Sequence, residues 1–276
     1  MARMLNRRIV LGGLVALPAF AALAQDRSLT IASTTSLEQS GLLEVVLPAF
    51  KAHSGIDVRV YSLASSQAIH TAKQGGIDLV LVNDPEAAAR FMEATDGARR
   101  EFIMYNDFVI AGPRSDPAGI NGLDNIAAGL REIARRRAQM VSRGDHSGTH
   151  AAEMRFWGTA AVNPKARSGR WYREVGLGMG PALEVANRLQ AYILTDRGTY
   201  LAHRSRIDLS VLVENDPHGI NEYDVILLNP AKYPGVRAEL ANQFIDWILS
   251  AEGQNTITAH KIDGEPLFMP AALRTH

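Results

Sequence analysis

Consecutive hydroxyl residues stand where a short apolar segment passes into a helical pattern near the start of the chain. Residues 28–33, SLTIAS, are typical of a buried strand, and a helix is predicted over 41–53. Backbone N–H groups at a helix N-terminus lack internal partners and carry partial positive charge, and neutral hydroxyls add donors without a competing charge. This combination favours an oxyanion, whereas helix capping would account for only one of the hydroxyls. The hydroxyl residues are Ser33, Thr34, Thr35 and Ser36.

A second turn of the same kind follows the next predicted strand, residues 56–63. Ser65 and Ser66 stand between that strand and a helix predicted over 66–74. Because ligands of parallel α/β sheets lie beyond the carboxyl ends of the strands, both turns are expected at one site. Helix capping is the alternative explanation for these two serines.

The densest polar segment is VSRGDHSGTH, residues 141–150, in a predicted strand-to-helix loop. Arg143 offers a planar fork of five N–H donors, which suits an oxyanion better than any other side chain. Asp145 is predicted either to hold that fork in place or to cap the helix that follows over 149–159. The glycines of this loop allow close approach of the backbone.

Two other kinds of site fit the same segment. His146 and His150 are spaced i, i+4 with Glu153 one turn further on, which is compatible with a metal site, although the HExxH pattern is absent. Ser147 or His150 could serve a hydrolase, although the G-x-S-x-G elbow of one large hydrolase class is absent. Both remain open alternatives at this stage.

Two later segments are weaker candidates. Gly176, Gly178 and Gly180 do not form G-x-G-x-x-G and no clear strand precedes them, so a dinucleotide site is not indicated. Arg197, in the turn LTDRGTY, is either a second guanidinium facing the ligand or part of a solvated turn in which it pairs with Asp196.

The order of apolar segments indicates an α/β fold with a mixed, mostly parallel sheet. A long β-type run over 101–113 suits a segment that passes between two lobes, and a return is expected near 211–223. We expect lobe I to comprise residues 25–110 and 214–276, and lobe II residues 111–213, with a cleft between them. The other predicted elements are helices over 85–95, 123–138 and 236–259 and strands over 77–84, 139–144, 207–213 and 221–230.

Residues 1–24 are expected to be a cleaved secretory signal peptide. They carry Arg3, Arg7 and Arg8, an apolar run over 9–23 and a small-residue cleavage site at Ala24. The arginine pair is compatible with both the general and the twin-arginine export routes. With no cysteine in the chain, disulfides, thiolate metal sites and a lipid-anchoring cysteine are excluded, and a soluble periplasmic protein is expected.

Because the chain has no net positive charge, any anion site must be formed by groups that lie close to the anion. The 276 residues contain 29 basic and 29 acidic side chains, and removal of the three arginines of the leader leaves a net charge of −3. Such a charge neither attracts anions at long range nor indicates a nucleic-acid partner.

Six segments in order resemble the tungstate-binding periplasmic components of ABC transporters, which are related to molybdate-binding proteins and have the type II periplasmic binding protein fold. The resemblance covers nearly all of residues 28–270, and the first loop has Ser-Thr-Thr-Ser where the family has a run of threonines. The segments are STTS, YNDFVIAGP, SRGDHSGTH, GMG, LTDRGTY and KIDGEPLF. The oxyanion contacts that the resemblance implies are Ser33, Thr34, Thr35, Ser36, Arg143, Ser147, Thr149 and Arg197.

The sequence and this resemblance together imply a non-catalytic binding protein without cofactor or metal. It would capture tungstate or molybdate between the lobes as a monomer and deliver the anion to an inner-membrane ABC permease. Phosphate or a small carboxylate is the alternative ligand. Phosphate keeps a proton near neutral pH and would need an acceptor. An Asp145 side chain that points at the ligand would therefore favour phosphate, and one that only orients Arg143 would favour tungstate or molybdate.

Overall fold

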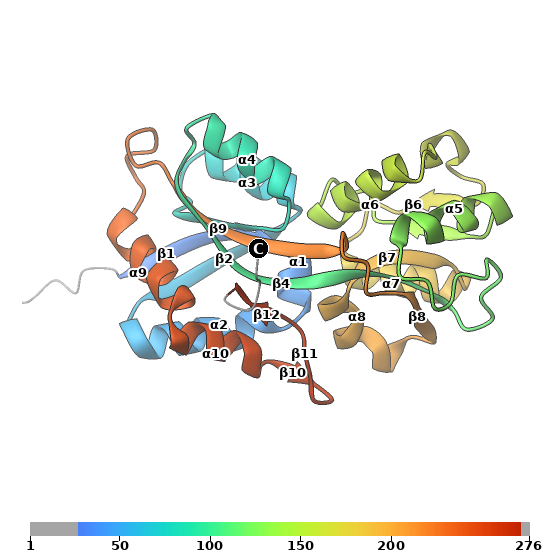
Figure 1. Ribbon diagram of the computed structural model, residues 1–276. Coiled ribbons are helices and arrows are strands. Elements are labelled where there is room, and N and C mark those ends of the chain that lie inside the picture. Colours follow the sequence, from blue (N-terminus) through green and yellow to red (C-terminus); the bar gives the residue numbers. More distant parts are fainter. Residues whose placement is uncertain (1–26, 272–276) are drawn as a thin grey trace, which may run out of the picture.

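The molecule consists of two α/β halves that lie side by side, each a sheet with helices on both faces (Figure 1). The computed structural model describes residues 27–271. The long strands β4 (Gly97–Pro113) and β9 (Ile220–Leu228) run between the halves. The α/β class with parallel strands in each half is therefore confirmed.

The first half, here called lobe I, is built on three parallel strands. β1 pairs with β2 on one side and with β3 on the other, and all of its residues are buried, which explains its apolar composition. β9 then pairs antiparallel with β3. The elements are β1 (Ser28–Thr34), α1 (Thr35–Gln39), α2 (Leu42–Ser54), β2 (Asp57–Leu63), α3 (Ser65–Lys73), β3 (Leu79–Val82) and α4 (Pro85–Glu93).

The second half, lobe II, repeats this arrangement. β5 pairs in parallel with β6 and with β7, and α6 follows β5 through the loop that the sequence singled out. Its strands and long helices are β5 (Met140–Ser142), β6 (Tyr172–Glu174), β7 (Tyr192–Asp196), β8 (Leu209–Val213), α5 (Ile126–Arg136), α6 (Gly148–Thr159), α7 (Met179–Leu189) and α8 (Arg197–His203). Two short 3₁₀ helices are Pro164–Arg167 and Arg204–Arg206.

β4 belongs to both sheets. Up to Asp107 it pairs antiparallel with β9, and from Phe108 it pairs antiparallel with β7. The chain passes back from β8 to β9 through residues 214–219. We propose the two lobe boundaries at these points, which are close to those expected from sequence.

The C-terminal segment packs on lobe I. Phe244 and Trp247 lie against Phe50 of α2, with ring centroids 5.0 and 5.4 Å from the Phe50 ring. The single helix expected over 236–259 is two helices because Ser250 is extended, and its side chain accepts from the backbone N–H of Gly253 to cap the second. The elements are α9 (Ala238–Leu249), α10 (Ala251–Ala259), β10 (Lys261–Ile262), β11 (Glu265–Pro266) and β12 (Met269–Pro270).

The first loop also differs from the prediction. β1 runs through Thr34 and passes directly into α1, where we expected a loop up to residue 40. The Thr34 hydroxyl accepts from the backbone N–H of Leu37, whose side chain is fully buried, and this cap starts the extra helix. Gly41, with φ of +77°, is then the N-cap residue of α2, which begins at Leu42.

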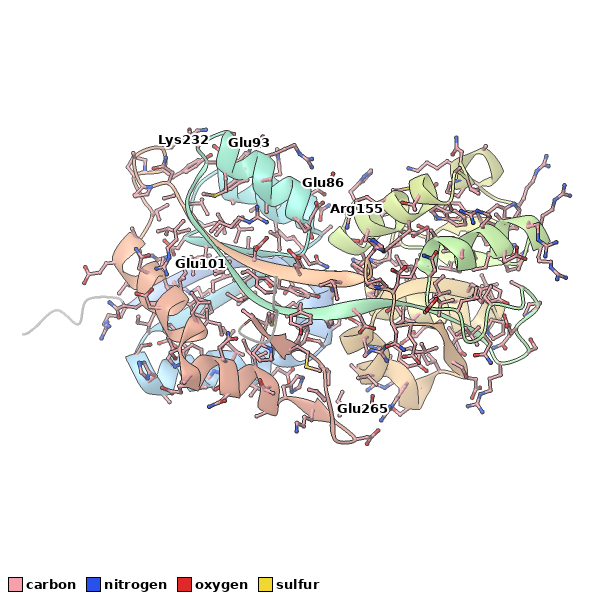
Figure 2. The ribbon with its side chains drawn as sticks, viewed as in Figure 1. Glu86, Glu93, Glu101, Arg155, Lys232 and Glu265 are labelled. Carbon is pink, nitrogen blue, oxygen red and sulfur yellow. The ribbon has the colours of Figure 1, made fainter. Side chains whose placement is uncertain are left out.

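Each lobe has its own apolar interior, whereas charged side chains such as Glu86, Glu93 and Arg155 project outward (Figure 2). Across residues 27–271 no helix combines the length and the hydropathy needed to cross a membrane. The predicted leader and its cleavage near Ala24 lie outside the described residues.

Candidate functional site

Arg143 lies at the centre of a polar cluster that joins the two lobes. It follows β5 directly and its side chain is only 2% exposed. Its Nη2 donates to the hydroxyl of Thr35 in lobe I at 3.1 Å, and its Nη1 lies 3.5 Å from the hydroxyl of Thr149 on α6. The guanidinium therefore contacts residues of both lobes.

Asp145 holds the Arg143 fork. Its Oδ2 accepts from Nε and Nη2 of Arg143 at 3.1 and 2.6 Å. Its Oδ1 accepts from the backbone N–H and the hydroxyl of Ser147 at 3.2 and 2.6 Å. Both carboxylate oxygens are thus directed into their own loop, and the charge of Arg143 is neutralised locally.

The hydroxyls of the first loop lie beside this guanidinium. Ser33, Thr34 and Ser36 are buried and Thr35 is half-buried. The hydroxyls of Thr34 and Ser36 are 3.3 Å apart. The hydroxyl of Ser33 is buried without a hydrogen-bond partner in the described part of the chain. A buried donor without a partner is unfavourable unless a ligand or water supplies an acceptor.

The second hydroxyl turn contributes Ser65 rather than Ser66. Ser65 is fully buried, donates to Asn83 Oδ1 at 3.1 Å and accepts from the backbone N–H of Gly148 at 3.1 Å. Ser66 is exposed. Because Gly148 is the first residue of α6, Ser65 of lobe I contacts the N-terminus of a helix of lobe II.

A chain of asparagine side chains, which no sequence motif indicates, underlies the cluster. Asn83 donates to Asn221 at 3.1 Å, Asn221 donates to Asn106 at 2.7 Å, and Asn106 donates to Asp196 at 3.3 Å. Asn221 also donates to the buried hydroxyl of Tyr223 at 3.2 Å. Each asparagine stands in or beside a strand, and an asparagine next to a strand is equally typical of an ordinary turn. No sequence signal therefore distinguished them.

Asp196 is the other carboxyl of the cluster, and its oxygens are occupied as well. Its Oδ1 accepts from the backbone N–H of Thr199 and its Oδ2 from the Thr199 hydroxyl, both at 2.8 Å. Burial raises the pKa of the Asp196 carboxyl, and the bonds from Thr199 oppose that rise.

A protein-family model described as a PBP superfamily domain matches residues 21–252. The chain belongs to the PBP superfamily. Within it, a tungstate-binding protein of Peptoclostridium acidaminophilum is 38% identical over 251 residues, which are 90% of this chain and 87% of the relative.

Two solved structures are similar to this chain in both sequence and fold. The tungstate ABC transporter structure from Geobacter sulfurreducens is 40% identical, covers 83% of this chain and 97% of its own, and has a TM-score of 0.77. The tungstate-binding protein of Desulfovibrio alaskensis G20 is 38% identical, covers 88% of this chain and 98% of its own, and has a TM-score of 0.76.

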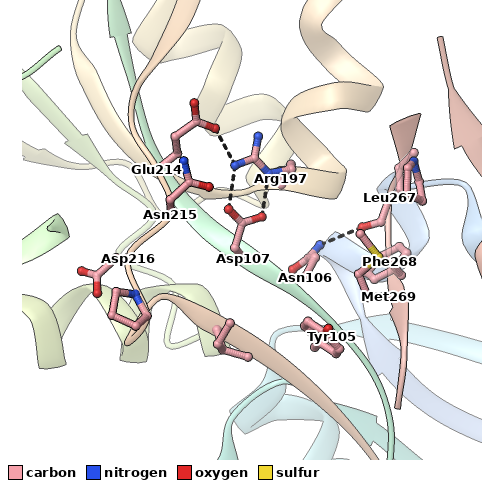
Figure 3. A pocket seen from close by; sticks show the side chains of 13 residues that line it. Tyr105, Asn106, Asp107, Arg197, Glu214, Asn215, Asp216, Leu267, Phe268 and Met269 are labelled. Atoms are coloured by element: carbon pink, nitrogen blue, oxygen red, sulfur yellow. Dashed lines mark hydrogen bonds and ion pairs between the residues drawn. The ribbon is translucent and has the colours of Figure 1, made fainter. Parts of the chain in front are cut away.

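Arg197 of this PBP-superfamily chain is held elsewhere, at the base of the connection between the lobes (Figure 3). Its Nε and Nη2 donate to the two oxygens of Asp107, each at 2.7 Å, and Nη2 also donates to Glu214 at 2.8 Å. The three side chains border a cavity of about 510 Å³. These ion pairs raise the pKa of Arg197. The structure thus brings Arg143 to the cluster and places Arg197 with two carboxylates beside the strands that connect the lobes.

The side chains of the metal alternative do not come together as a set of three, although the ring centroids of His146 and His150 lie 5.6 Å apart. His146 is exposed, whereas His150 is buried and its Nδ1 accepts from the backbone N–H of His146 at 3.1 Å. Glu153 is enclosed by three donors from lobe II itself. Among residues 27–271 no group of three or more His, Asp or Glu side chains is placed to hold a metal ion.

The arrangement expected of a hydrolase does not form either. The Ser147 hydroxyl donates to Asp145 and accepts from the backbone N–H of His150, so it caps α6. The Nδ1 atom of His150 accepts from a backbone N–H group and not from this hydroxyl.

Proposed function

We propose that this chain captures tungstate or molybdate between its two lobes, as the binding component of an ABC importer. Arg143 and the buried hydroxyls around it would replace the hydration shell of the dianion. The ligand contacts that we propose are Ser33, Thr34, Thr35, Ser36, Arg143 and Thr149. Ser66 is left out because it is exposed, and Arg197 because its guanidinium is paired with Asp107 and Glu214. Ser65 and Ser147 are left out because their single hydroxyl protons are donated to Asn83 and Asp145.

The observation that carries the proposal is the combination of Arg143 and Ser33 in one buried cluster. Nη1 of the buried Arg143, which makes one long hydrogen bond of 3.5 Å to Thr149, and the Ser33 hydroxyl, which is buried without a partner in the described chain, are donors that a small anion satisfies. Burying a dianion is favourable only where nearly all of its oxygens accept hydrogen bonds. Charged donors on planar forks and neutral hydroxyls meet that requirement.

The orientation of Asp145 favours a ligand that carries no proton. Both of its oxygens accept from Arg143 and Ser147, so it offers no acceptor to the proton of hydrogen phosphate. The oxygens of Asp196 are likewise occupied by Thr199 and Asn106. Tungstate and molybdate carry no proton near neutral pH and need donors alone. Relatives named tungstate-binding proteins support the same ligand class.

The partner and the location follow from the same proposal. The chain would act as a monomer in the periplasm, after cleavage of its leader near Ala24, and would hand the anion to an inner-membrane permease. The match to an ABC transporter structure supports a permease partner. No catalytic step and no cofactor are needed.

A thermal-shift screen with tungstate, molybdate, sulfate, phosphate and chromate tests the proposal. A ligand that binds only the folded state adds about 2.7 kcal/mol of stability at a hundredfold excess over its dissociation constant. We expect tungstate and molybdate to raise the melting temperature at micromolar concentrations and phosphate to have no effect. Stabilisation by phosphate alone, or by none of the anions, would refute the proposal.

A further inference from the structure

The lobes meet at a second point, next to the proposed anion contacts but formed by other residues. Gln39 is the last residue of α1 in lobe I, and its Oε1 accepts from the backbone N–H of Gly180 at 2.8 Å. Gly180 is the second residue of α7 in lobe II. The bond therefore joins residues 141 positions apart and exists only while the two lobes are in contact.

Glycine at position 178 provides the room for this contact. A Cβ atom added at Gly178 would lie 3.2 Å from Nε2 of Gln39 and 3.6 Å from the hydroxyl of Thr35. Gly178 has φ of −61° and ψ of 167°, a conformation that any residue adopts. The missing side chain is thus needed for space between the lobes and not for backbone freedom. The glycine loop therefore allows the two lobes to approach each other closely, a role that is separate from anion binding.

We propose that Gln39 and the glycine loop at 178–180 form an interlobe latch. The latch residues do not contact the bound anion, but they set how long it is retained. The proposal rests on the proposed capture of an anion between the lobes. Gln39 is a positioning residue in this scheme.

The latch and the anion contacts share one short helix. Thr35, which accepts from Arg143, and Gln39, which accepts from Gly180, are the first and last residues of α1. Arg143 and the latch therefore hold the two ends of α1 against lobe II. A bond made only in the closed arrangement increases its population, and apparent affinity scales with that population.

The absence of cysteine from the chain permits a direct measurement of lobe separation. Glu86 on α4 and Arg155 on α6 are exposed and stand on different lobes (Figure 2). Spin labels on Glu86→Cys and Arg155→Cys would report the interlobe distance by pulsed electron resonance, in buffer without added anion and with sodium tungstate. Stopped-flow measurement gives the tungstate dissociation rate.

Two variants and one control test the latch. Gln39→Met keeps the length of the side chain and removes the acceptor, and we expect tungstate to dissociate about fivefold faster. Gly178→Leu places a side chain between the lobes, and we expect a longer label distance and at least tenfold weaker binding. Gly158→Leu is the control, because Gly158 is exposed on α6 with no atom within 4 Å of an added Cβ, and it should match the parent protein.

The outcomes separate the latch from the proposed ligand. Parent-like distances and dissociation rates in both Gln39→Met and Gly178→Leu would overturn the latch even if the parent binds tungstate well. If the parent binds no tungstate, the proposed function fails, and the label distances in anion-free buffer still decide the latch. A shorter distance in the parent than in Gly178→Leu would then support it, and equal distances would refute it.

Discussion

Nη2 of Arg143 donates to the hydroxyl of Thr35 at 3.1 Å although 108 positions of sequence separate the two residues. The contact joins the β5–α6 loop of lobe II to the first residue of α1 in lobe I. The buried guanidinium has three side-chain partners, Asp145 and Thr149 in lobe II and Thr35 in lobe I, which offset the cost of its burial. The environment of this one charge therefore depends directly on whether the lobes are closed.

Replacement of Arg143 should weaken tungstate binding more than replacement of any single hydroxyl. We expect Arg143→Ala to lose roughly 2–5 kcal/mol of binding free energy, because a buried charged donor is removed. Ser36→Ala should lose about 1–3 kcal/mol, since only a neutral donor is lost. Titration calorimetry on both variants measures the difference, and equal, negligible effects would remove Arg143 from the site.

Much of this site was predictable because strand ends in a parallel sheet converge. Placing hydroxyls after the first two strands and Arg143 after β5 was enough to predict one interlobe cluster. The choice between Ser65 and Ser66 was not predictable, because both follow the same strand. Only the packing of α3 decides that Ser65 is directed to Asn83 and that Ser66 is exposed.

Long-range pairing explains what the sequence could not reveal. The turn LTDRGTY gave no indication that Asp107, 90 positions earlier, would hold Arg197. The extra helix α1 depends on burial of Leu37 in lobe I, which a local pattern of hydroxyls does not report. The break at Ser250 likewise depends on how α9 and α10 pack around α2.

A methyl group at position 148 should interfere with closure at the site itself. A Cβ atom on Gly148 would lie 2.3 Å from Oδ1 and 2.6 Å from the backbone oxygen of Asn83 in lobe I. We expect Gly148→Ala to weaken tungstate binding at least tenfold, which corresponds to about 1.4 kcal/mol. Calorimetry gives the affinity, and a melting curve shows whether the fold is retained.

The matched control for this substitution is Gly158→Ala in the same helix. An added Cβ there meets no atom within 4 Å, so binding should be unchanged. Stability should rise by up to about 1 kcal/mol, because alanine is the better helix former. Equal binding by Gly148→Ala and Gly158→Ala would contradict the closed interlobe contact.

Arg197→Ala should affect stability more than binding. The substitution leaves Asp107 and Glu214 facing each other without the cation that now pairs with both. Asp107 is 24% exposed, so we expect a loss of about 1–2 kcal/mol of unfolding free energy rather than the larger loss of a fully buried pair. Urea unfolding and calorimetry measure the two effects. Loss of tungstate binding with unchanged stability would instead return Arg197 to the site.

The enclosed carboxyl of Glu153 should make stability depend on pH. It accepts from Ser142 at 2.7 Å, Trp157 at 3.0 Å and Tyr172 at 2.9 Å, and burial raises its pKa from 4.5 to about 7. The folded protein therefore keeps a proton that the unfolded chain loses between pH 4.5 and 7. Stability should fall as the pH rises through this window and level off above it, by about 3 kcal/mol in total.

Glu153→Gln isolates this contribution because glutamine is neutral at every pH and has nearly the same shape. Its oxygen can accept from Trp157 and Tyr172, and its amide group can donate to the Ser142 hydroxyl. Other titrating groups are common to both proteins, so the difference between their urea-unfolding free energies reports Glu153 alone. Between pH 4.5 and 8 the parent should lose about 3 kcal/mol relative to the variant. Parallel stability curves would mean that the Glu153 carboxyl is ionised at its ordinary pKa despite its burial.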